Sequence, residues 1–345
     1  MGTIVHAGTD KGIVTLLADE GAVSEVGRGL QDWEVSTIAV DPRESNRVFA
    51  GTRGDGVWLS EDAGRSWRKP NYGKPGPGKV RSLTFDPSTP NRLYAGGEPI
   101  DLFVTEDQGR SWDRLDTLWD NPHVATVGYP SPRVEPHVRH VAVDPSDPNT
   151  IYLALQVGYI VKSTDGGRTW SLLDHDLDCD VHTIRIDPRD SRKLMIATGG
   201  GDSRKGKVAG RSIYASADGG ATWSGLAMDQ WQEYSVPLAQ SPGDPDLYYC
   251  ALANGNPGRW DRPEGANSAF IRSRDGGQSW EKMDLPGAEA TRDYVEGIAF
   301  DPAHPERMFA GTKDGVLFQS ADEGTTWERV DLPFKEITTL EACPA

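Results

Sequence analysis

One octapeptide recurs six times along this sequence of 345 residues. Its copies are SEDAGRSW at 60–67, TEDQGRSW at 105–112, STDGGRTW at 163–170, SADGGATW at 216–223, SRDGGQSW at 273–280 and SADEGTTW at 320–327. The Trp residues of successive copies are 45–58 residues apart, which is the length of a four-stranded blade with variable loops. We therefore expect a β-propeller rather than two ordinary domains.

Each position of this octapeptide, called the box below, suits a tight turn. The Asp can accept hydrogen bonds from backbone N–H groups of the turn, and the Gly two residues later tolerates positive φ. The Trp offers a large apolar ring for packing between blades. Because an active site needs only one set of residues, we expect the repeated box Asp residues to be structural: Asp62, Asp107, Asp165, Asp218, Asp275 and Asp322.

A second element alternates with the boxes, as in VSTIAVDPRESNRVFAGT and VEGIAFDPAHPERMFAGT, and reads as strand, Asp-Pro turn, strand. We name these strands A and B; strand C precedes the box and strand D follows it. The chain starts with TIVHAGTDKGIVTLL, a B and C pair without an A, followed by a degenerate box that retains only Asp19 and Gly21. It finishes with EITTLEACP at 336–344, an A strand without a B. The prediction is an all-β, single-domain fold over 1–345: a seven-bladed β-propeller of four-stranded antiparallel blades, its ring closed by the C-terminal strand pairing with the N-terminal blade.

Composition excludes several classes of protein. Asp plus Glu number 52 and Lys plus Arg 36, so the net charge of −16 disfavours nucleic acid and anionic membranes as partners. No apolar run could span a bilayer, and the N-terminus lacks the pattern of a secretory signal, which predicts a cytoplasmic protein. An odd number of cysteines without CxxC spacing predicts neither a disulfide framework nor a zinc site: Cys179, Cys250 and Cys343.

The boxes and Asp-Pro turns resemble those of BNR or Asp-box propellers, which include bacterial sialidases, xyloglucan-active endoglucanases, the sortilin ectodomain and photosystem II assembly propellers. The resemblance implies the fold, but its members have unrelated functions. No Arg-Ile-Pro motif occurs, which argues against a sialidase. Resemblance to the xyloglucan-active members places one catalytic Asp at Asp10, in HAGTDKG, and the other on a second propeller that these repeats do not provide.

Three long loops, 116–136, 199–212 and 254–268, are predicted to lie on the face of the propeller where ligands bind. Four Trp residues outside the boxes and strands lie in segments that join strand D to strand A or strand B to strand C. These rings either stack on a sugar or anchor their own loops: Trp33, Trp119, Trp231 and Trp260.

The start of each A strand is the second predicted source of ligand-binding residues. Alignment of these strands brings Arg81, Arg139, His182 and Glu296 to one register. We expect the two arginines to bind a carboxylate or phosphate, and His182 and Glu296 to act as acid or base. Residues two positions before this register are predicted to contribute to the same site: His137, Asp180, Tyr234 and Tyr294. The alternative is a water-filled channel lined by solvated side chains.

No cofactor is predicted. A metal site of His123, His137, His175 and His182 is conceivable, but no HxH or HExxH spacing supports it. The sequence favours binding, and possible cleavage by glycosidase-like or lyase-like chemistry, of a polar, glycan-type or anionic ligand on the loop-rich face. The alternative is a scaffold without catalytic activity that holds a protein partner on that face.

Overall fold

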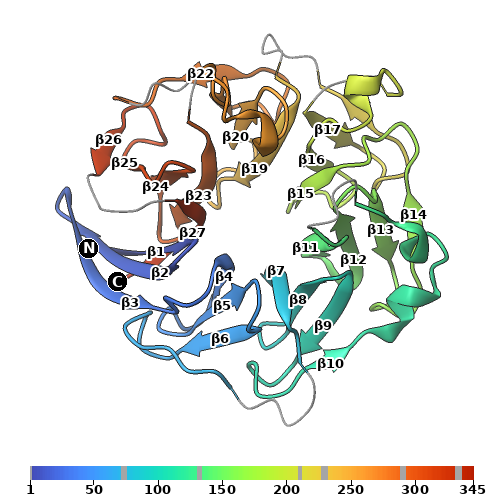
Figure 1. The fold of residues 1–345 in the computed structure, drawn as a ribbon, viewed down its shortest axis with the longest axis horizontal. Coiled ribbons are helices and arrows are strands. Elements are labelled where there is room, and N and C mark those ends of the chain that lie inside the picture. Colours follow the sequence, from blue (N-terminus) through green and yellow to red (C-terminus); the bar gives the residue numbers. More distant parts are fainter. Residues whose placement is uncertain are drawn as a thin grey trace. The chain divides into compact units, whose positions relative to one another are not determined.

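The computed structural model describes residues 2–70, 76–129, 134–208, 212–226, 232–287, 293–330 and 336–345. These residues form two compact units (Figure 1): unit 1 comprises Met1–Lys69 and Pro237–Ala345, and unit 2 comprises Pro70–Val236. Regular structure in the described residues is β-strand apart from four short 3-10 helices, and no described helix is long and apolar enough to cross a membrane.

Unit 1 contains four antiparallel sheets. Its N-terminal sheet has the order β27-β1-β2-β3, with β27 (Ile337–Pro344), β1 (Thr3–Thr9), β2 (Gly12–Asp19) and β3 (Ala22–Gly29). The next comprises β4 (Val35–Val40), β5 (Val48–Thr52) and β6 (Val57–Ser60). The third comprises β19 (Tyr234–Gln240), β20 (Tyr248–Ala253), β21 (Ala269–Ser273) and β22 (Glu281–Met283); the first residues of β19 belong to unit 2. The fourth comprises β23 (Val295–Asp301), β24 (His304–Thr312), β25 (Leu317–Ser320) and β26 (Glu328–Val330). The 3-10 helix η4 (Pro257–Arg259) lies between β20 and β21.

Unit 2 contains three antiparallel sheets of four strands. They comprise β7 (Lys79–Phe85), β8 (Leu93–Glu98), β9 (Asp101–Thr105) and β10 (Asp113–Arg114); β11 (Val138–Asp144), β12 (Asp147–Leu155), β13 (Ile160–Ser163) and β14 (Ser171–Leu173); and β15 (Val181–Ile186), β16 (Leu194–Thr198), β17 (Ile213–Ser216) and β18 (Ser224–Gly225). The 3-10 helices are η1 (Asp116–Asp120), η2 (Val124–Thr126) and η3 (Ser203–Lys205).

These sheets are the blades of a seven-bladed β-propeller, as predicted. The described part of the β4–β6 blade has three strands, and an isolated bridge between Leu59 and Arg68 stands where a fourth would begin. The predicted closure is also confirmed: β27 pairs with β1 from Thr3 opposite Pro344 to Thr9 opposite Ile337 (Figure 1, red beside blue). Whether the whole chain forms a single domain stays a prediction.

The box is a self-contained hydrogen-bonded turn. In the first copy, Asp62 Oδ1 accepts from Ser60 Oγ and from the Ser66 amide, both at 2.8 Å, and Ser60 Oγ accepts from the Gly64 amide at 2.8 Å. The same bonds recur in the other boxes. Hydrogen bonds from the Thr169 side chain and backbone lower the pKa of Asp165 to about 2. The box carboxylates are thus fully used in holding the turn.

The box turn at 216–223 also packs against the preceding blade. Tyr152 Oη and Lys162 Nζ, from β12 and β13, donate to the Gly219 carbonyl in the next blade's box at 3.2 and 3.0 Å. Box Trp residues fill the interface beside these bonds; the rings of Trp327 and Phe270 have their centroids 5.7 Å apart. We call the surface that receives a box turn its socket.

His6 occupies a position in strand B of the N-terminal blade where other blades carry aromatic residues such as Phe49 and Phe309. The side chain is fully buried, and its Nδ1 lies 3.2 Å from Thr15 Oγ1, whose own hydrogen goes to the Gly64 carbonyl. His6 Nδ1–H is therefore the donor, and Nε2 is left without a partner among the described residues. Burial lowers the pKa of His6 from 6.5 to about 4.

Acid is expected to destabilise the protein through His6. Between pH 6.5 and about 4, His6 is protonated in the unfolded chain but not in the folded chain. The free energy of unfolding therefore decreases as the pH falls through this window. The loss is on the order of 3 kcal/mol for a shift of this size. His6→Phe removes this contribution, so urea denaturation at pH 7 and pH 4.5 should show a smaller difference in the variant than in the parent. An unchanged difference would contradict a buried neutral imidazole.

Candidate functional site

A β-bulge marks the start of strand A in six blades. At each bulge, the register of Cα pairing shifts around one residue of strand A. The residues that the Cα register skips are Ser36, Arg81, Arg139, His182, Glu296 and Thr338. The sequence alignment placed these residues at one register, and a bulge frees their side chains from the pleat of the sheet.

In unit 2, the Arg81 guanidinium is already neutralised. Its Nε lies 2.7 Å from Glu98 Oε2, and the two side chains are only 9% and 3% exposed. Lys79 adds a second cation to the same carboxylate, at 3.9 Å, and reaches Glu135 at 3.3 Å. Arg139 is half-buried and has no ion-pair partner within 4.0 Å in the described part of the chain. The Arg81–Glu98 pair reduces the attraction of this region for an anion, and sequence reasoning missed Glu98, which is distant from Arg81 along the chain.

His182 lies in a buried polar cluster at the start of β15. Its Nδ1 meets the carbonyl oxygen of Ser235, which can only accept, so Nδ1 carries a hydrogen. Nε2 lies 3.3 Å from Asp180 Oδ1, to which Gln156 Nε2 donates at 2.8 Å. The edge of the His182 ring meets Tyr234, with centroids 5.2 Å apart.

The neighbouring glycine makes room for this cluster. A Cβ at Gly199 would lie 2.0 Å from Asp180 Oδ2 and 2.9 Å from His182 Cε1. The structure therefore brings three predicted residues together, Asp180, His182 and Tyr234, in an arrangement that can hold or move a proton. His137, also buried, directs its Nδ1 to the Glu135 carbonyl at 2.9 Å.

Unit 1 contains a cleft of about 490 Å³ on the loops that follow β20, β22 and β24. Trp260, half-buried in the loop 254–268, lies over Tyr294 with ring centroids 4.8 Å apart, and its Nε1 donates to the Gly255 carbonyl at 3.2 Å. Tyr294 is fully buried and donates to the Ala251 carbonyl at 3.1 Å. Trp260 thus both anchors its loop and lines a cleft, so the two readings of this ring are compatible.

Charged side chains surround the indole in the cleft. Asp293 Oδ1 accepts from the amides of Tyr294 and Asp314 at 2.7 and 3.0 Å, yet burial raises the pKa of Asp293. Burial opposes the charge on Lys313, but an ion pair with Glu336 outweighs it and raises the pKa of Lys313, with Glu296 contributing. The lining residues are Trp260, Asp261, Arg262, Asp293, Tyr294, Lys313 and Asp314, among others.

Sequence reasoning named two lining residues of the cleft, Trp260 and Tyr294, and missed Asp293, Lys313 and Asp314. A signal was present in the turn between strands B and C. The sequence Gly-Thr-Lys-Asp-Gly at 311–315 repeats the pattern Gly-Thr-Asp-Lys-Gly at 8–12. This alignment places Lys313 at the position of Asp10.

The remaining predicted residues lie elsewhere. Asp10 is half-buried between β1 and β2 and does not line the cleft. Trp33 packs over Gly54, where a Cβ would lie 2.8 Å from its ring, so it anchors its own loop. Trp119 is 40% exposed on η1, and Trp231 lies outside the described residues.

The histidines do not gather into a metal centre. Where the structure describes the chain, no three His, Cys, Asp or Glu side chains are grouped to hold a metal ion. His123 directs its Nε2 to the Gly158 carbonyl at 3.0 Å, and exposed His175 pairs with Asp176 at 3.2 Å.

Known proteins with similar sequences fall into two groups. The family described as photosynthesis system II assembly factor YCF48 matches residues 225–337. A xyloglucanase, Xgh74A of Acetivibrio thermocellus, is 34% identical over an alignment of 184 residues; the match covers 42% of this chain and 20% of the xyloglucanase. The chain therefore spans only part of the curated relatives that it matches.

Matched solved structures include members of the same two groups. A GH74 enzyme of Niastella koreensis matches 94% of this chain and 46% of its own, with a TM-score of 0.63 and 18% identity. YCF48 from Cyanidioschyzon merolae matches 88% of this chain and 86% of its own, with a TM-score of 0.56 and 14% identity. A structure of YCF48 bound to D1 peptide matches 92% of this chain and 93% of its own, with a TM-score of 0.59 and 16% identity. At these identities the likeness shows the fold: a seven-bladed propeller resembling both xyloglucanase and assembly-factor propellers.

Proposed function

We propose that the protein binds an oligosaccharide in the Trp260 cleft of unit 1. The observation that carries the proposal is a half-buried indole, supported from below by Tyr294, in a cleft of about 490 Å³ lined by charged side chains. An aromatic face packs against the C–H groups of a sugar ring, while carboxylates and ammonium groups hydrogen-bond its hydroxyls. The cleft is within the size range of small-molecule sites.

The charges in the cleft favour a neutral sugar. Three carboxylates, Asp261, Asp293 and Asp314, face two cations, Arg262 and Lys313, and Lys313 is paired with Glu336. An anionic ligand would find no surplus positive charge here. The identity with a xyloglucanase over 184 residues makes xyloglucan oligosaccharides the first ligands to test.

Cleavage of the bound sugar is a further possibility that the same cleft allows. The raised pKa of Asp293 suits a proton donor, because it keeps the acid form populated to a higher pH. Hydrolysis also needs a second carboxylate about 5–10 Å from the first. Asp261 and Asp314 are the candidates from the cleft lining.

A protein-binding scaffold is the second candidate function. It is supported by the match with a structure of YCF48 bound to D1 peptide, which covers 92% of this chain and 93% of that one. Failure of all glycans to bind would favour this alternative.

Trp260→Ala is expected to weaken binding of neutral xyloglucan oligosaccharides at least tenfold, since loss of the stacking surface costs about 1.4 kcal/mol or more. Titration calorimetry with neutral and acidic oligosaccharides measures this. Trp119→Ala is the matched control, because Trp119 is exposed and does not line the cleft. Equal affinity in the parent and the Trp260 variant, or no binding by any glycan, contradicts the proposal. Release of reducing sugar that is lost in Asp293→Asn would extend it to hydrolysis.

A further inference from the structure

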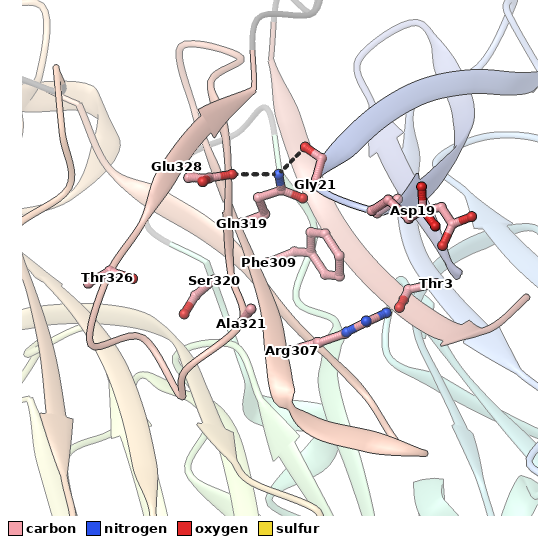
Figure 2. Close-up of a pocket in the computed structure, with 12 residues that line it drawn as sticks. Thr3, Asp19, Gly21, Arg307, Phe309, Gln319, Ser320, Ala321, Thr326 and Glu328 are labelled. Atoms are coloured by element: carbon pink, nitrogen blue, oxygen red, sulfur yellow. Dashed lines mark hydrogen bonds between the residues drawn. The ribbon is translucent and has the colours of Figure 1, made fainter. Parts of the chain in front are cut away.

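A second cavity, of about 220 Å³, lies in unit 1 between the β2–β3 hairpin and the blade β23–β26 (Figure 2). Ala18 and Gly21 line it from the hairpin side, and Phe309, Gln319 and Ala321 from the other blade. This cavity is separate from the Trp260 cleft, with which it shares no lining residue.

The corresponding positions one blade earlier hold a box turn. In the sequence repeat, Phe309, Gln319 and Ala321 align with Tyr249, Arg272 and Arg274. Tyr249 Oη and Arg272 Nη1 both donate to the Glu323 carbonyl of the following box at 2.7 Å. Arg274 Nη1 pairs with the Glu323 carboxylate at 3.0 Å. The lining of the cavity is therefore the same surface that is a filled socket in the preceding blade.

Box turns contact the preceding blade at three other places, two of them through the strand surface and one through η1. Thr15 donates to the Gly64 carbonyl of the box at 60–67 at 3.2 Å. Tyr152 and Lys162 donate to the box at 216–223, and Thr117 donates to the Gly167 carbonyl of the box at 163–170. A box turn in its socket is thus the repeated interface of this fold.

The socket at Phe309 lacks its box because the N-terminal blade has only a two-residue turn. Asp19 pairs directly with Ala22, leaving Glu20 and Gly21 as the turn. Gly21 supplies one carbonyl, which accepts from Gln319 Nε2 at 3.1 Å, and Gln319 also bonds Glu328 (Figure 2). A Cβ at Gly21 would meet nothing within 4 Å, so space remains beside the turn. No Trp follows this turn, in contrast to the six boxes.

We propose that this unfilled socket binds an aromatic side chain presented on a tight, basic turn of another polypeptide. An engineered apolar cavity of about 150 Å³ binds benzene, so one of about 220 Å³ has room for an indole. The ring of Phe309 lines this cavity and offers an aromatic surface to the guest side chain. The rim carries Asp19, Glu20 and Glu328 against the single cation Arg307, which favours a turn carrying Arg or Lys.

The probe is a head-to-tail cyclised peptide with the sequence of the box at 163–170, STDGGRTW, which contains a glycine turn, an Arg and a Trp. It is titrated into the full-length protein and followed by shifts in amide NMR signals. Binding is expected, with at least a tenfold loss when the peptide Trp is replaced by Ala. No binding of the probe, or equal binding of the Ala peptide, overturns the proposal.

Ala321→Leu tests the location. Ala321 is exposed at the second box position and lines the cavity, so the larger side chain should obstruct the cavity and weaken binding at least tenfold without affecting the fold. Ala217→Leu is the matched control at the same position of another box, and it should bind as the parent does. Ala18→Leu obstructs the cavity from β2 as an independent variant, with near-UV circular dichroism as the check on folding. Binding unchanged in both cavity variants, or self-association of the parent that Ala321→Leu abolishes, would overturn the proposal, the latter in favour of a second copy of this chain.

Discussion

Removal of residues 336–345 is expected to abolish cooperative folding of unit 1. These residues contain β27, the strand that pairs with β1 along its whole length and contributes buried Ile337, Leu340 and Ala342 to the core shared with β2 and β24. Without β27, the backbone edge of β1 has no partner and that core is open to water. We expect loss of the thermal transition and aggregation.

Strand complementation makes this test specific. Size-exclusion chromatography and circular dichroism compare the parent, the truncated chain and a chain that lacks only Ala345, which is exposed. Addition of a synthetic peptide of residues 336–345 should restore the thermal transition, and a scrambled peptide should not. A truncated chain that stays monomeric with the parent's melting temperature would show that β27 is dispensable.

Trp223→Ala is expected to lower the free energy of unfolding by about 3–5 kcal/mol, the usual range for a large-to-small change in a core. Trp223 is the Trp of the fourth box, only 5% exposed, and packs in a cluster with Tyr152 and Ala154 of the preceding blade. Truncation of the ring leaves a cavity at the interface between two blades. Urea denaturation measures the loss.

Two further variants test whether the loss of stability depends on the size of the side chain at position 223 and on the buried position of the Trp. Trp223→Phe keeps most of the apolar surface and should cost less than Trp223→Ala. Trp119→Ala, at a ring 40% exposed on η1, should change stability by less than about 0.5 kcal/mol. Equal effects at the two Trp positions would show that the box Trp does not stabilise the packing between blades.

The fold followed from the sequence because its signals are local and repeated. The box contains its own hydrogen-bond donors and acceptors within eight residues, so the turn at Asp62 could be predicted without knowledge of its surroundings. The unpaired A strand at 336–344 and the missing A strand at the N-terminus predicted the β27–β1 pairing in the same way.

The candidate sites were only partly predictable because their chemistry depends on contacts distant in sequence. Alignment of the A strands identified Arg81, but the pairing of Arg81 with Glu98 depends on how β7 and β8 bring two side chains together. The Trp260 loop was predicted by its length, whereas the support from Tyr294 below the indole was not.

The glycine-rich segment at 199–207, part of the long loop predicted at 199–212, is held by one buried carboxylate. Asp178, fully buried, accepts the backbone N–H groups of Gly201, Asp202 and Ser203 at 2.8–2.9 Å. This arrangement needs an acid from the preceding strand connection to meet three consecutive amides, and nothing in the glycine pattern encodes that meeting.

At the bulges that mark the start of the A strands, the side chain differs from blade to blade while the strand pairing on both sides stays the same. A residue inside the β-ladder faces a cross-strand neighbour in register, whereas the Cα register skips Ser36, Arg81 and Glu296. A hydroxyl, a guanidinium and a carboxylate thus stand at equivalent points of three blades that keep the same strand pairing. One scaffold can in this way present different chemistry at one register without a change in its β-ladder.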